Sequence, residues 1–431
     1  MSKATVKLWG TTIGYVAMEP EESFARFEYD PEFAHMGIEP APLQMPVKAR
    51  RIYQFPRLHP RTFHGLPGLL ADSLPDKYGN QLINVWLAQT GRRESEFNAV
   101  DRLCYVGSRA VGALEYVPSM PLKGSRDQQL RVDQLVELAA LAFTSRETLQ
   151  ARLAEGMGSR ELLEIVSVGT SAGGARAKAV IAYNPATQEV RSGQTDLKPG
   201  FEHWLIKFDG VKFSGDWGVA DPAGYGLLEY SYYLMARRCG IDMMECRIFA
   251  ENGRSHFMTR RFDRSEKGEK HFVQTFGAIA HADYYESGAY SYEQIIMAMR
   301  ELGMEQSMLE EQVRRIVFNL VGCNQDDHVK NTSFMMDRQG RWCLSPAYDL
   351  CHAEGSDFTR HHQLRLNGKT HDFDMSDLKH LADYAGLPRG RERLILDKTL
   401  EAFKGWRVEA SALGIPERLQ QHVLGTLRLD W

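Results

Sequence analysis

The sequence predicts an α+β protein of two lobes, in which a β-rich N-terminal lobe, preceded by an extra subdomain, leads into a mostly helical C-terminal lobe. Before about residue 260, apolar residues alternate with polar ones or form short apolar runs, as strands do. Beyond that point helical spacing prevails. One example is an apolar helix face that repeats at i, i+3, i+4, i+7 and i+8 through Val313, Ile316, Val317, Leu320 and Val321.

Length and composition indicate a multidomain globular protein. The 431 residues exceed one ordinary core, and the 43% hydrophobic and 25% charged fractions are those of a globular chain. A stretch with two prolines, a glycine and several charges at 118–126 is the best linker. We therefore expect an N-terminal subdomain at 1–120, a β-rich lobe at 127–259 and a helical lobe at 260–431.

Charge and hydropathy argue against several classes of function. A formal net charge of −4 disfavours an independent nucleic-acid binder or a basic membrane-surface protein. No run approaches eighteen apolar residues, and the amino terminus lacks the pattern of a signal peptide. The six cysteines form no C-x-x-C pair and fit reduced thiols. We expect a cytoplasmic protein with no membrane partner.

Local patterns predict the elements in order. Strands alternate over 5–29, a helix spans 81–89, and two helices follow at 133–143 and 146–155. Apolar strands are expected at 179–183 and 203–208, and a helix at 227–239 ends before Gly240. Strands at 247–250 and 255–259 flank Asn252-Gly253, a pair typical of tight hairpins.

Two features of the predicted β-rich lobe suit an anion. Residues 167–178 hold three glycines, two hydroxyls and two basic side chains, and the backbone N–H groups of such a loop can converge on phosphates. Lys178 or Arg176 would add charge, although a structural turn is an equally ordinary interpretation. Lys207 lies on an apolar strand, where an ammonium is costly to bury without an anion; the alternative is an edge-strand lysine facing water. Glu229 either reaches Lys207 or stays at the surface.

The stretch 324–331 (NQDDHVKN) carries the strongest chemistry. An aspartate and an asparagine five positions apart match the loop that supplies a base and a magnesium ligand in phosphoryl transfer, here Asp326 and Asn331. A hairpin predicted at 332–336 and 341–344 folds the chain back and brings Asp349 toward Asn331 as a second ligand. His328 would orient the loop. The alternative is a solvated polar turn that caps a helix.

Seven motifs in this order resemble HipA-type serine/threonine kinases, the toxins of bacterial type II toxin–antitoxin modules. The motifs are LLADSLPDKYG (69–79), GTSAGGARAKA (169–179), LIKF (205–208), RFDR (261–264), QTFG (274–277), DDHVKN (326–331) and LSPAYDL (344–350). The resemblance implies a protein-kinase-like, HipA-like two-lobed fold. It also implies ATP and Mg²⁺ as cofactors.

The same resemblance assigns site residues by position. Asp326 matches the catalytic aspartate, within a loop that includes His328 and Lys330, while Asn331 and Asp349 match the magnesium ligands. Ser171 matches a serine that such kinases phosphorylate on themselves, with Thr170 as the adjacent alternative. The ATP-binding positions are Lys207, Ser171, Ala172, Gly173, Gly174, Ala175, Lys178 and the hinge Met258, Thr259, Arg260 and Arg261. Where familiar members often have an acidic residue, this chain has Arg260.

The resemblance also implies substrate and partners. Familiar members phosphorylate an aminoacyl-tRNA synthetase, glutamyl-tRNA synthetase above all, or another translation factor, and thereby arrest growth. A small helix-turn-helix antitoxin of the HipB type neutralises them and binds operator DNA. We therefore expect DNA contact only through the antitoxin complex.

The sequence is also consistent with three alternative functions. The fold could serve a small-molecule phosphotransferase, since nothing identifies the acceptor, or a non-catalytic ATP-binding corepressor. A metal-dependent hydrolase would use Asp326, Asp327 and His328 as ligands, although neighbouring residues on one loop rarely converge on one ion. The pair His361-His362 is expected at the surface.

Overall fold

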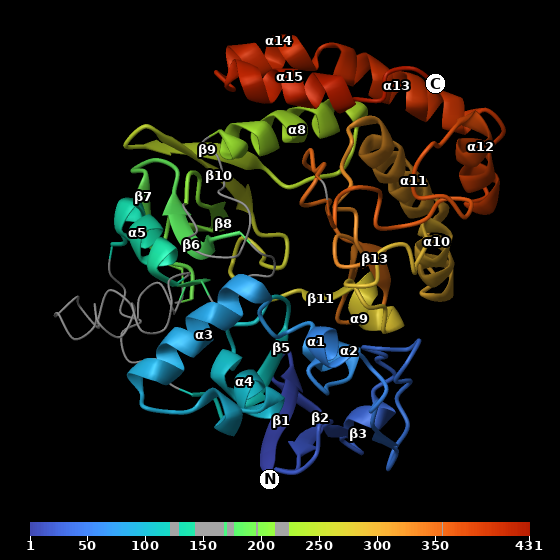
Figure 1. Ribbon diagram of the computed structural model, residues 1–431. Coiled ribbons are helices and arrows are strands. Elements are labelled where there is room, and N and C mark those ends of the chain that lie inside the picture. Colours follow the sequence, from blue (N-terminus) through green and yellow to red (C-terminus); the bar gives the residue numbers. More distant parts are fainter. Residues whose placement is uncertain (121–128, 143–167, 170–175, 195–196, 212–223, 356) are drawn as a thin grey trace. The chain divides into compact units, whose positions relative to one another are not determined.

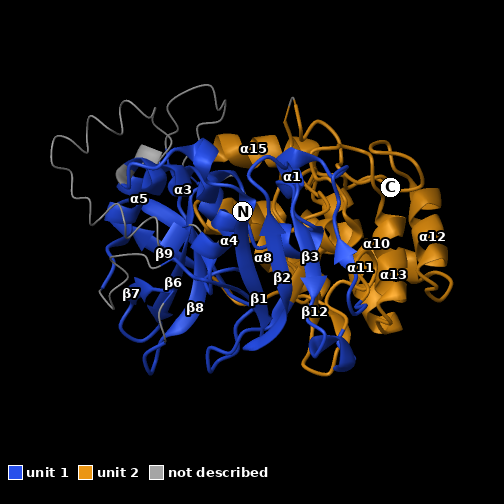
Figure 2. Cartoon of the chain, turned by 90° about the horizontal axis from the view of Figure 1, so that it is seen from below, with its two compact units in different colours: residues 1–38, 47–226, 247–272 blue, residues 39–46, 227–246, 273–431 orange. Residues whose placement is uncertain are grey.

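The computed structural model describes the chain except residues 121–128, 143–167, 170–175, 195–196, 212–223 and 356 (Figure 1). The described residues form two compact units, shown in different colours in Figure 2. Unit 1 comprises residues 1–38, 47–226 and 247–272, and unit 2 comprises residues 39–46, 227–246 and 273–431.

An antiparallel sheet of five strands opens unit 1, in the order β4-β3-β2-β1-β5. The β1–β2 pair runs in register from Ser2↔Met18 to Leu8↔Thr11, with a bulge after Val6. Its strands are β1 Ser2–Leu8, β2 Thr11–Met18, β3 Arg26–Tyr29, β4 Ile52–Tyr53 and β5 Leu114–Val117. The helices of this part are α1 Pro60–Phe63, α2 Gly68–Ala71, α3 Lys77–Gln89 and α4 Ala99–Val106.

The second sheet of unit 1 carries the lysines predicted to meet phosphate. Its order is β7-β6-β8-β10-β9. The predicted hairpin is confirmed, because β9 and β10 are joined by Asn252 and Gly253 with φ of +46° and +75°. The strands are β6 Lys178–Asn184, β7 Glu189–Ser192, β8 Glu202–Lys207, β9 Cys246–Glu251 and β10 Arg254–Arg260.

One hydrophobic core joins the two parts of unit 1. Helices α3 and α5 (Val132–Ala142) contribute buried side chains to the core that β6, β8 and β10 also fill. Its members include Tyr78, Leu82, Trp86, Leu135, Val136, Ile181, Trp204, Ile206 and Met258. Residues that the sequence assigns to an N-terminal subdomain and to a separate lobe therefore pack together, and the boundary between them stays a prediction.

A buried ion cluster fixes the RFDR motif within unit 1. Asp263 is 3% exposed and accepts hydrogen bonds from Arg261 Nε at 2.8 Å and Arg264 Nη1 at 2.6 Å. The amide of Gly112 donates to the same carboxylate at 2.8 Å, and Arg264 donates to the carbonyls of Gly112 and Ala110. The motif thus attaches the end of β10 to the loop before β5. Burial opposes ionisation of Asp263, but the two guanidinium groups outweigh it and lower the pKa of this carboxyl.

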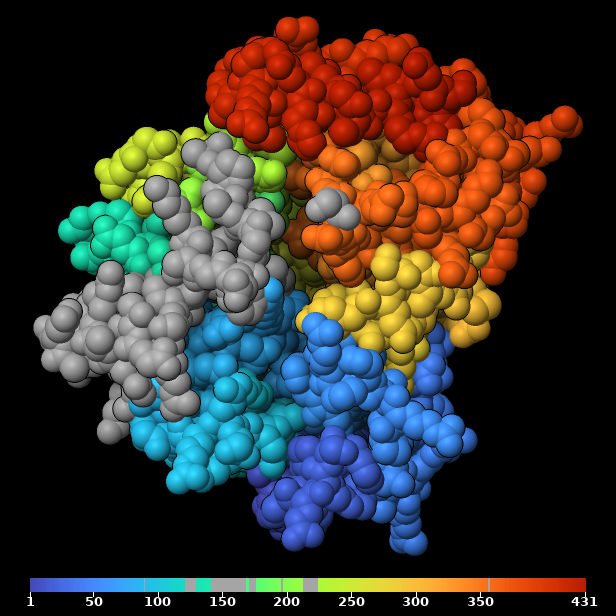
Figure 3. Space-filling view, viewed as in Figure 1, coloured from blue at the N-terminus to red at the C-terminus, as the bar shows by residue number. Residues whose placement is uncertain are grey.

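Unit 2 is mostly helical. Tyr232 of α8 is fully buried, donates to the carbonyl of Gly322 at 2.6 Å, and contacts the rings of Phe318, Phe403 and Trp406. The last helices, α13 to α15, form one continuous red surface of this unit in Figure 3. The helices are α8 Tyr225–Cys239 (from Leu227 onward in this unit), α9 Phe276–Ala280, α10 Tyr292–Glu301, α11 Gln306–Val321, α12 Met375–Tyr384, α13 Arg391–Lys404, α14 Trp406–Ala412 and α15 Glu417–Thr426.

A three-stranded sheet in the order β11-β12-β13 completes unit 2. Its strands are β11 Phe272–Thr275 (from Val273 onward in this unit), β12 Ser333–Met336 and β13 Trp342–Leu344. The predicted β12–β13 hairpin is confirmed, and Asp337 closes its turn by accepting from the amides of Gln339 and Arg341, each at 2.9 Å. The predicted helix at 146–155 lies outside the described residues. In the described part of the chain, no helix has the length and apolar character to cross a membrane.

Candidate active site

Helix α11 delivers the candidate catalytic loop. Its apolar face is buried as the spacing predicts, and the helix is capped at Gly322. A side chain at this glycine would clash, because a Cβ would lie 2.6 Å from Phe403 Cζ and 2.9 Å from the carbonyl oxygen of Phe318. Cys323 follows with a φ of +52°, so the chain turns sharply out of the helix. The backbone from which the catalytic loop begins is therefore held in one conformation.

Asp326 and Asn331 are linked within this loop. Asn331 Nδ2 donates to the main-chain oxygen of Asp326 at 2.7 Å, and the Asn331 amide donates to the oxygen of His328 at 2.9 Å. The side chain of Asp326 is 47% exposed, as a base that meets a substrate hydroxyl requires. The loop thus presents the carboxylate to solvent while its backbone is fixed from within.

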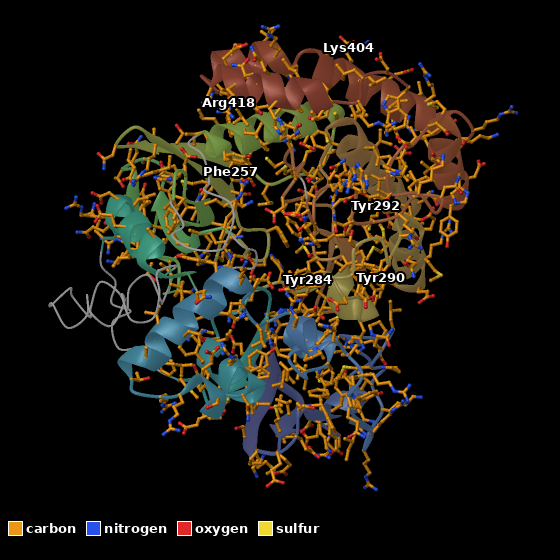
Figure 4. The ribbon with its side chains drawn as sticks, viewed as in Figure 1. Phe257, Tyr284, Tyr290, Tyr292, Lys404 and Arg418 are labelled. Carbon is orange, nitrogen blue, oxygen red and sulfur yellow. The ribbon has the colours of Figure 1, made fainter. Side chains whose placement is uncertain are left out.

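His328 and Lys330 stabilise the loop through contacts with each other and with Tyr284. His328 Nδ1 accepts from the amide of Lys330 at 3.2 Å, and its Nε2 lies 3.9 Å from Asp326 Oδ1. The ring of Tyr284, labelled in Figure 4, has its centroid 5.7 Å from that of His328, and Lys330 Nζ lies 4.8 Å from the Tyr284 centroid. These contacts fix the position of the His328 ring, and its role in orienting the loop stays a prediction.

Main-chain hydrogen bonds join the QTFG motif (274–277) to the catalytic loop. The amide of Gly277 donates to the carbonyl of Val329 at 2.9 Å, and the amide of Phe276 donates to the carbonyl of Thr332 at 2.8 Å. A Cβ on Gly277 would lie 3.2 Å from Val329 Cγ2. A glycine is therefore the residue that allows this close approach between α9 and the loop.

The β12–β13 hairpin returns the chain to the loop at Tyr348-Asp349. Tyr348 Oη donates to the carbonyl of Lys330 at 2.6 Å, so the residues that precede Asn331 and Asp349 are in contact. Asn324 Nδ2 lies 3.4 Å from the carbonyl oxygen of Asp349. Asp349 itself has a φ of +51°, a left-handed conformation that few residues other than glycine and asparagine or aspartate adopt. Such backbone positions concentrate at functional sites.

The donor atoms in this region suit a magnesium ion. Because the Asn331 amide nitrogen is bonded to Asp326, the amide oxygen is the end that a cation would meet. A carboxylate at Asp349 would add a second hard oxygen ligand, and Mg²⁺ in phosphoryl-transfer sites takes one or two such ligands plus phosphate oxygens. Among the described residues, no group of three or more His, Cys, Asp or Glu side chains is arranged to hold a metal by itself.

The neighbouring Asp327 points into the protein and has a different environment. It is 2% exposed and accepts from His362 Nδ1 at 2.8 Å, from the amide of Gln363 at 2.7 Å and from the hydroxyl of Tyr292. The expectation that His361-His362 is a surface pair is wrong for His362, which is 3% exposed because it pairs with this buried carboxylate. A hydrolase site with Asp326, Asp327 and His328 as metal ligands finds no support, because the Asp326 carboxylate is exposed whereas the Asp327 carboxylate is buried.

In unit 1, two lysines predicted to bind ATP lie side by side. Lys178 at the start of β6 and Lys207 at the end of β8 are register partners, so their side chains leave the same face of the sheet. Lys178 is 3% exposed. Lys207 Nζ lies 5.6 Å from the centroid of the Phe257 ring on β10 (Figure 4). The predicted phosphate loop, with Thr170, Ser171, Ala172, Gly173, Gly174 and Ala175, lies outside the described residues.

The predicted hinge is the end of β10. Met258, Thr259 and Arg260 pair with Ile206, Leu205 and Trp204 of β8. The amide of Arg261 donates to the carbonyl of His203 at 3.0 Å, and its guanidinium is bonded to Asp263. Arg260, at the position where the family often has an acid, lies 3.7 Å from Glu202 and 3.5 Å from Glu266. These two nearby acidic side chains thus offset the positive charge of Arg260.

Two family profiles match the sequence. The HipA N-terminal domain matches residues 4–117, and the HipA-like C-terminal domain matches residues 170–406, more than half of the chain. The chain belongs to the HipA family. The fold agrees, because HipA of Shewanella oneidensis MR-1, solved in a complex with HipB and its operator DNA, aligns with a TM-score of 0.65 over 98% of this chain and 94% of that chain, at 14% identity. The predicted α+β, kinase-like fold is therefore confirmed.

Two further similarities are more limited. The Sinorhizobium fredii protein named "Putative kinase Y4dM" is 30% identical over 240 residues, which cover 49% of this chain and about half (53%) of that protein. The Helicobacter pylori proinflammatory kinase CtkA aligns with a TM-score of 0.31 at 10% identity over 49% of this chain and 90% of that chain, too low to carry an argument.

Local sequence patterns do not identify the buried polar side chains that pack around the catalytic loop. They are Asp327, which is a structural acid, and Tyr292, Asn319, Asn324 and His362. One pattern could have revealed part of this set. Asn319 stands within the apolar repeat of α11, where a polar side chain that cannot reach solvent needs a buried partner. His362 and Tyr292 lie too far away in sequence for any local pattern to connect them to Asp327.

Proposed function

We propose that this protein is an ATP- and Mg²⁺-dependent serine/threonine protein kinase of the HipA toxin type. It transfers phosphate to a protein of the translation machinery, with glutamyl-tRNA synthetase as the first candidate, and to itself at Ser171, and the transfer arrests growth. The observation that carries the proposal is the bond between Asn331 and Asp326 in one loop, held against the segment that carries Asp349.

Asp326 is the general base in this proposal. Its exposed carboxylate accepts the proton of a serine or threonine hydroxyl as the oxygen attacks the terminal phosphoryl group of ATP. His328 and Lys330 hold the loop that orients this carboxylate. Phosphoryl transfer requires little covalent chemistry from the protein. Most of the rate acceleration therefore comes from the positioning of the reacting groups.

Asn331 and Asp349 would hold magnesium, and Lys178 and Lys207 would bind the phosphates of ATP. A bound Mg²⁺ neutralises charge on the phosphate oxygens. The two in-register lysines offer adjacent positive charges to a polyanion, which supports the assignment. The loop at 171–175, with Ser171 as the self-phosphorylated residue, would cover the same phosphates.

Adenine recognition is assigned to the main chain of Met258, Thr259 and Arg260. Arg261 is the fourth predicted hinge residue; its amide donates to the carbonyl of His203 and its guanidinium donates to Asp263. We therefore give Arg261 the role of positioning the hinge through the RFDR ion cluster.

A HipB-like helix-turn-helix antitoxin is the proposed partner. The solved Shewanella oneidensis structure that shares this fold contains HipA, HipB and operator DNA. The net charge of −4 supports DNA contact through the antitoxin and not through a basic surface of this chain.

The test is phosphate transfer to a defined acceptor. Wild type and Asp326→Asn are each incubated with glutamyl-tRNA synthetase, ATP and Mg²⁺, and phosphorylated peptides are mapped. We expect serine or threonine phosphorylation of the synthetase, or of another translation factor in its place, by wild type alone. Transfer only to small hydroxylated molecules would favour a small-molecule phosphotransferase. Binding of ATP without any transfer would favour a non-catalytic ATP-binding corepressor.

A further inference from the structure

A chain of buried hydrogen bonds runs through unit 2 behind the candidate catalytic loop. His362 and Tyr292 both donate to Asp327, and Asn319 Nδ2 donates to the hydroxyl of Tyr292 at 3.4 Å. Asn324 Nδ2 then lies 2.9 Å from Asn319 Oδ1 and 3.4 Å from the carbonyl oxygen of Asp349. The chain thus begins beside Asp326 and ends on the main chain of Asp349.

Every member of this chain is removed from solvent. The exposed fractions are 2% for Asp327, 1% for Tyr292, 8% for Asn319, 2% for Asn324 and 3% for His362. A buried carboxylate costs several kcal/mol unless its oxygens are well bonded, and well-packed apolar residues are often equally stabilising. Stability alone therefore does not explain why five polar side chains occupy this core.

The geometry offers a better explanation. The chain draws on α10, α11, the loop and the segment around His362, and its ends reach two proposed functional positions. Asp326 adjoins Asp327 covalently and accepts from Asn331, so fixing Asp327 also fixes the backbone from which the base and one metal ligand project. At the other end, Asn324 holds the carbonyl of Asp349.

We infer that Asp327, Tyr292, Asn319 and Asn324 form a positioning network that sets the spacing of Asp326, Asn331 and Asp349. This inference rests on the proposed function. The side chains of these four residues are buried and do not themselves meet substrate, so they act through the residues that do. Removing one hydroxyl from the network should misplace the base and the metal ligands together.

Tyr292→Phe is the sharpest test, because it removes one hydroxyl and keeps the buried ring. Tyr116→Phe is its matched control: Tyr116 is also 1% exposed, and its hydroxyl contacts Ser73 Oγ at 2.6 Å in unit 1. For Tyr292→Phe we expect kcat to fall by about tenfold or more with KM for ATP nearly unchanged, as misplacement of catalytic groups predicts. We also expect weaker binding of Mn²⁺ with a non-hydrolysable ATP analogue, by about 10-fold, followed by electron paramagnetic resonance. Tyr116→Phe should change neither.

The outcomes separate this inference from the proposed function. If Tyr292→Phe lowers only the free energy of unfolding, as Tyr116→Phe does, the network is structural and the inference is overturned. If wild type transfers no phosphate yet Tyr292→Phe still weakens Mn²⁺ binding, the kinase proposal fails and the network stands. A wild type that binds no Mn²⁺ beside the nucleotide would overturn the inference directly.

Discussion

Lys178 on β6 is the direct register partner of Lys207 on β8, so two ammonium groups leave the same face of one sheet. Two lysines at register-paired positions offer adjacent positive charges to a polyanion such as the phosphates of a nucleotide. In the sequence, the glycine-rich stretch 169–175 comes shortly before Lys178, the first residue of β6. This pairing is the main argument for a phosphate site in unit 1.

Replacing either lysine should weaken nucleotide binding. For Lys178→Met and Lys207→Met we expect the Kd for ATP to rise by about tenfold each, roughly 1.4 kcal/mol, because one phosphate contact is lost. Isothermal titration calorimetry measures the change. Lys404→Met, at the exposed end of α13, is the control and should bind ATP as wild type does (Figure 4). Unchanged affinity in both sheet variants would remove the phosphate assignment.

The RFDR ion cluster should be a large contributor to the stability of unit 1. Asp263→Asn leaves two buried guanidinium groups without their carboxylate, so we expect the free energy of unfolding to fall by about 3 kcal/mol or more. Urea denaturation gives the value. The matched control is Asp133→Asn, which breaks a surface pair with Arg131, 67% exposed, and should cost less than about 1 kcal/mol. Equal losses in the two variants would contradict this account.

His256 should make unit 1 sensitive to acid. Its Nδ1 accepts from the amide of Asp209 at 2.9 Å, so the ring is held neutral, with its proton on the Nε2 that faces Glu251. Burial is the main reason that the pKa of His256 falls to about 4, with Arg254 lowering it further and Asp209 opposing. The unfolded histidine binds a proton below about pH 6.5 and the folded one does not. Stability is therefore fully present above that pH and is lost between about pH 6.5 and 4.

The variant that tests this is His256→Asn, whose side-chain oxygen can still accept from Asp209. Wild type should lose about 1.2 kcal/mol of unfolding free energy through this group as the pH falls from 6 to 5. The variant should lose correspondingly less over the same interval, measured by urea denaturation at each pH. The same pH slope in both proteins would show that His256 is not the group responsible.

Replacing Gly322 should affect both the free energy of unfolding and the position of the catalytic loop. Gly322→Ala places a methyl group within 3 Å of Phe403 Cζ and of the Phe318 carbonyl, so α11 or α13 must shift. We expect a loss of about 1–3 kcal/mol in unfolding free energy, the usual range for overpacking. The rate of phosphate transfer should fall as well, because the loop begins at the next residue. Gly425→Ala, where no atom lies within 4 Å of the added Cβ, is the control.

Much of the fold follows from local sequence. Asn252-Gly253 and the turn at 337–340 fix two hairpins, and the spacing of apolar residues identifies the C-terminal half of α11. These features depend only on neighbouring residues, and a local pattern can therefore reveal them. The structure extends α11 back to Gln306, because packing continues the helix beyond its clear apolar repeat.

Long-range pairing is the part that the sequence does not reveal. Nothing local shows that α3 and β6 share one core, or that RFDR contacts Gly112, about 150 residues earlier. In the candidate site, the D-x4-N spacing singled out Asp326 and Asn331, but Asp327 looked like a second surface acid. Its partners Tyr292 and His362 are each 35 residues away, so only the folded chain shows that this carboxylate is buried and bonded.

The role of Asp326 as the base can be measured by intact-mass and peptide mass spectrometry of wild type and Asp326→Asn, each incubated with ATP and Mg²⁺. The side chain of Asp326 is 47% exposed and asparagine keeps its size, so we expect both proteins to unfold alike and to bind ATP alike. We expect one added phosphate at Ser171, or at the adjacent Thr170, in wild type and a rate at least about 100-fold lower in the variant. Equal phosphate incorporation in the two proteins would contradict the assignment of Asp326 as the base.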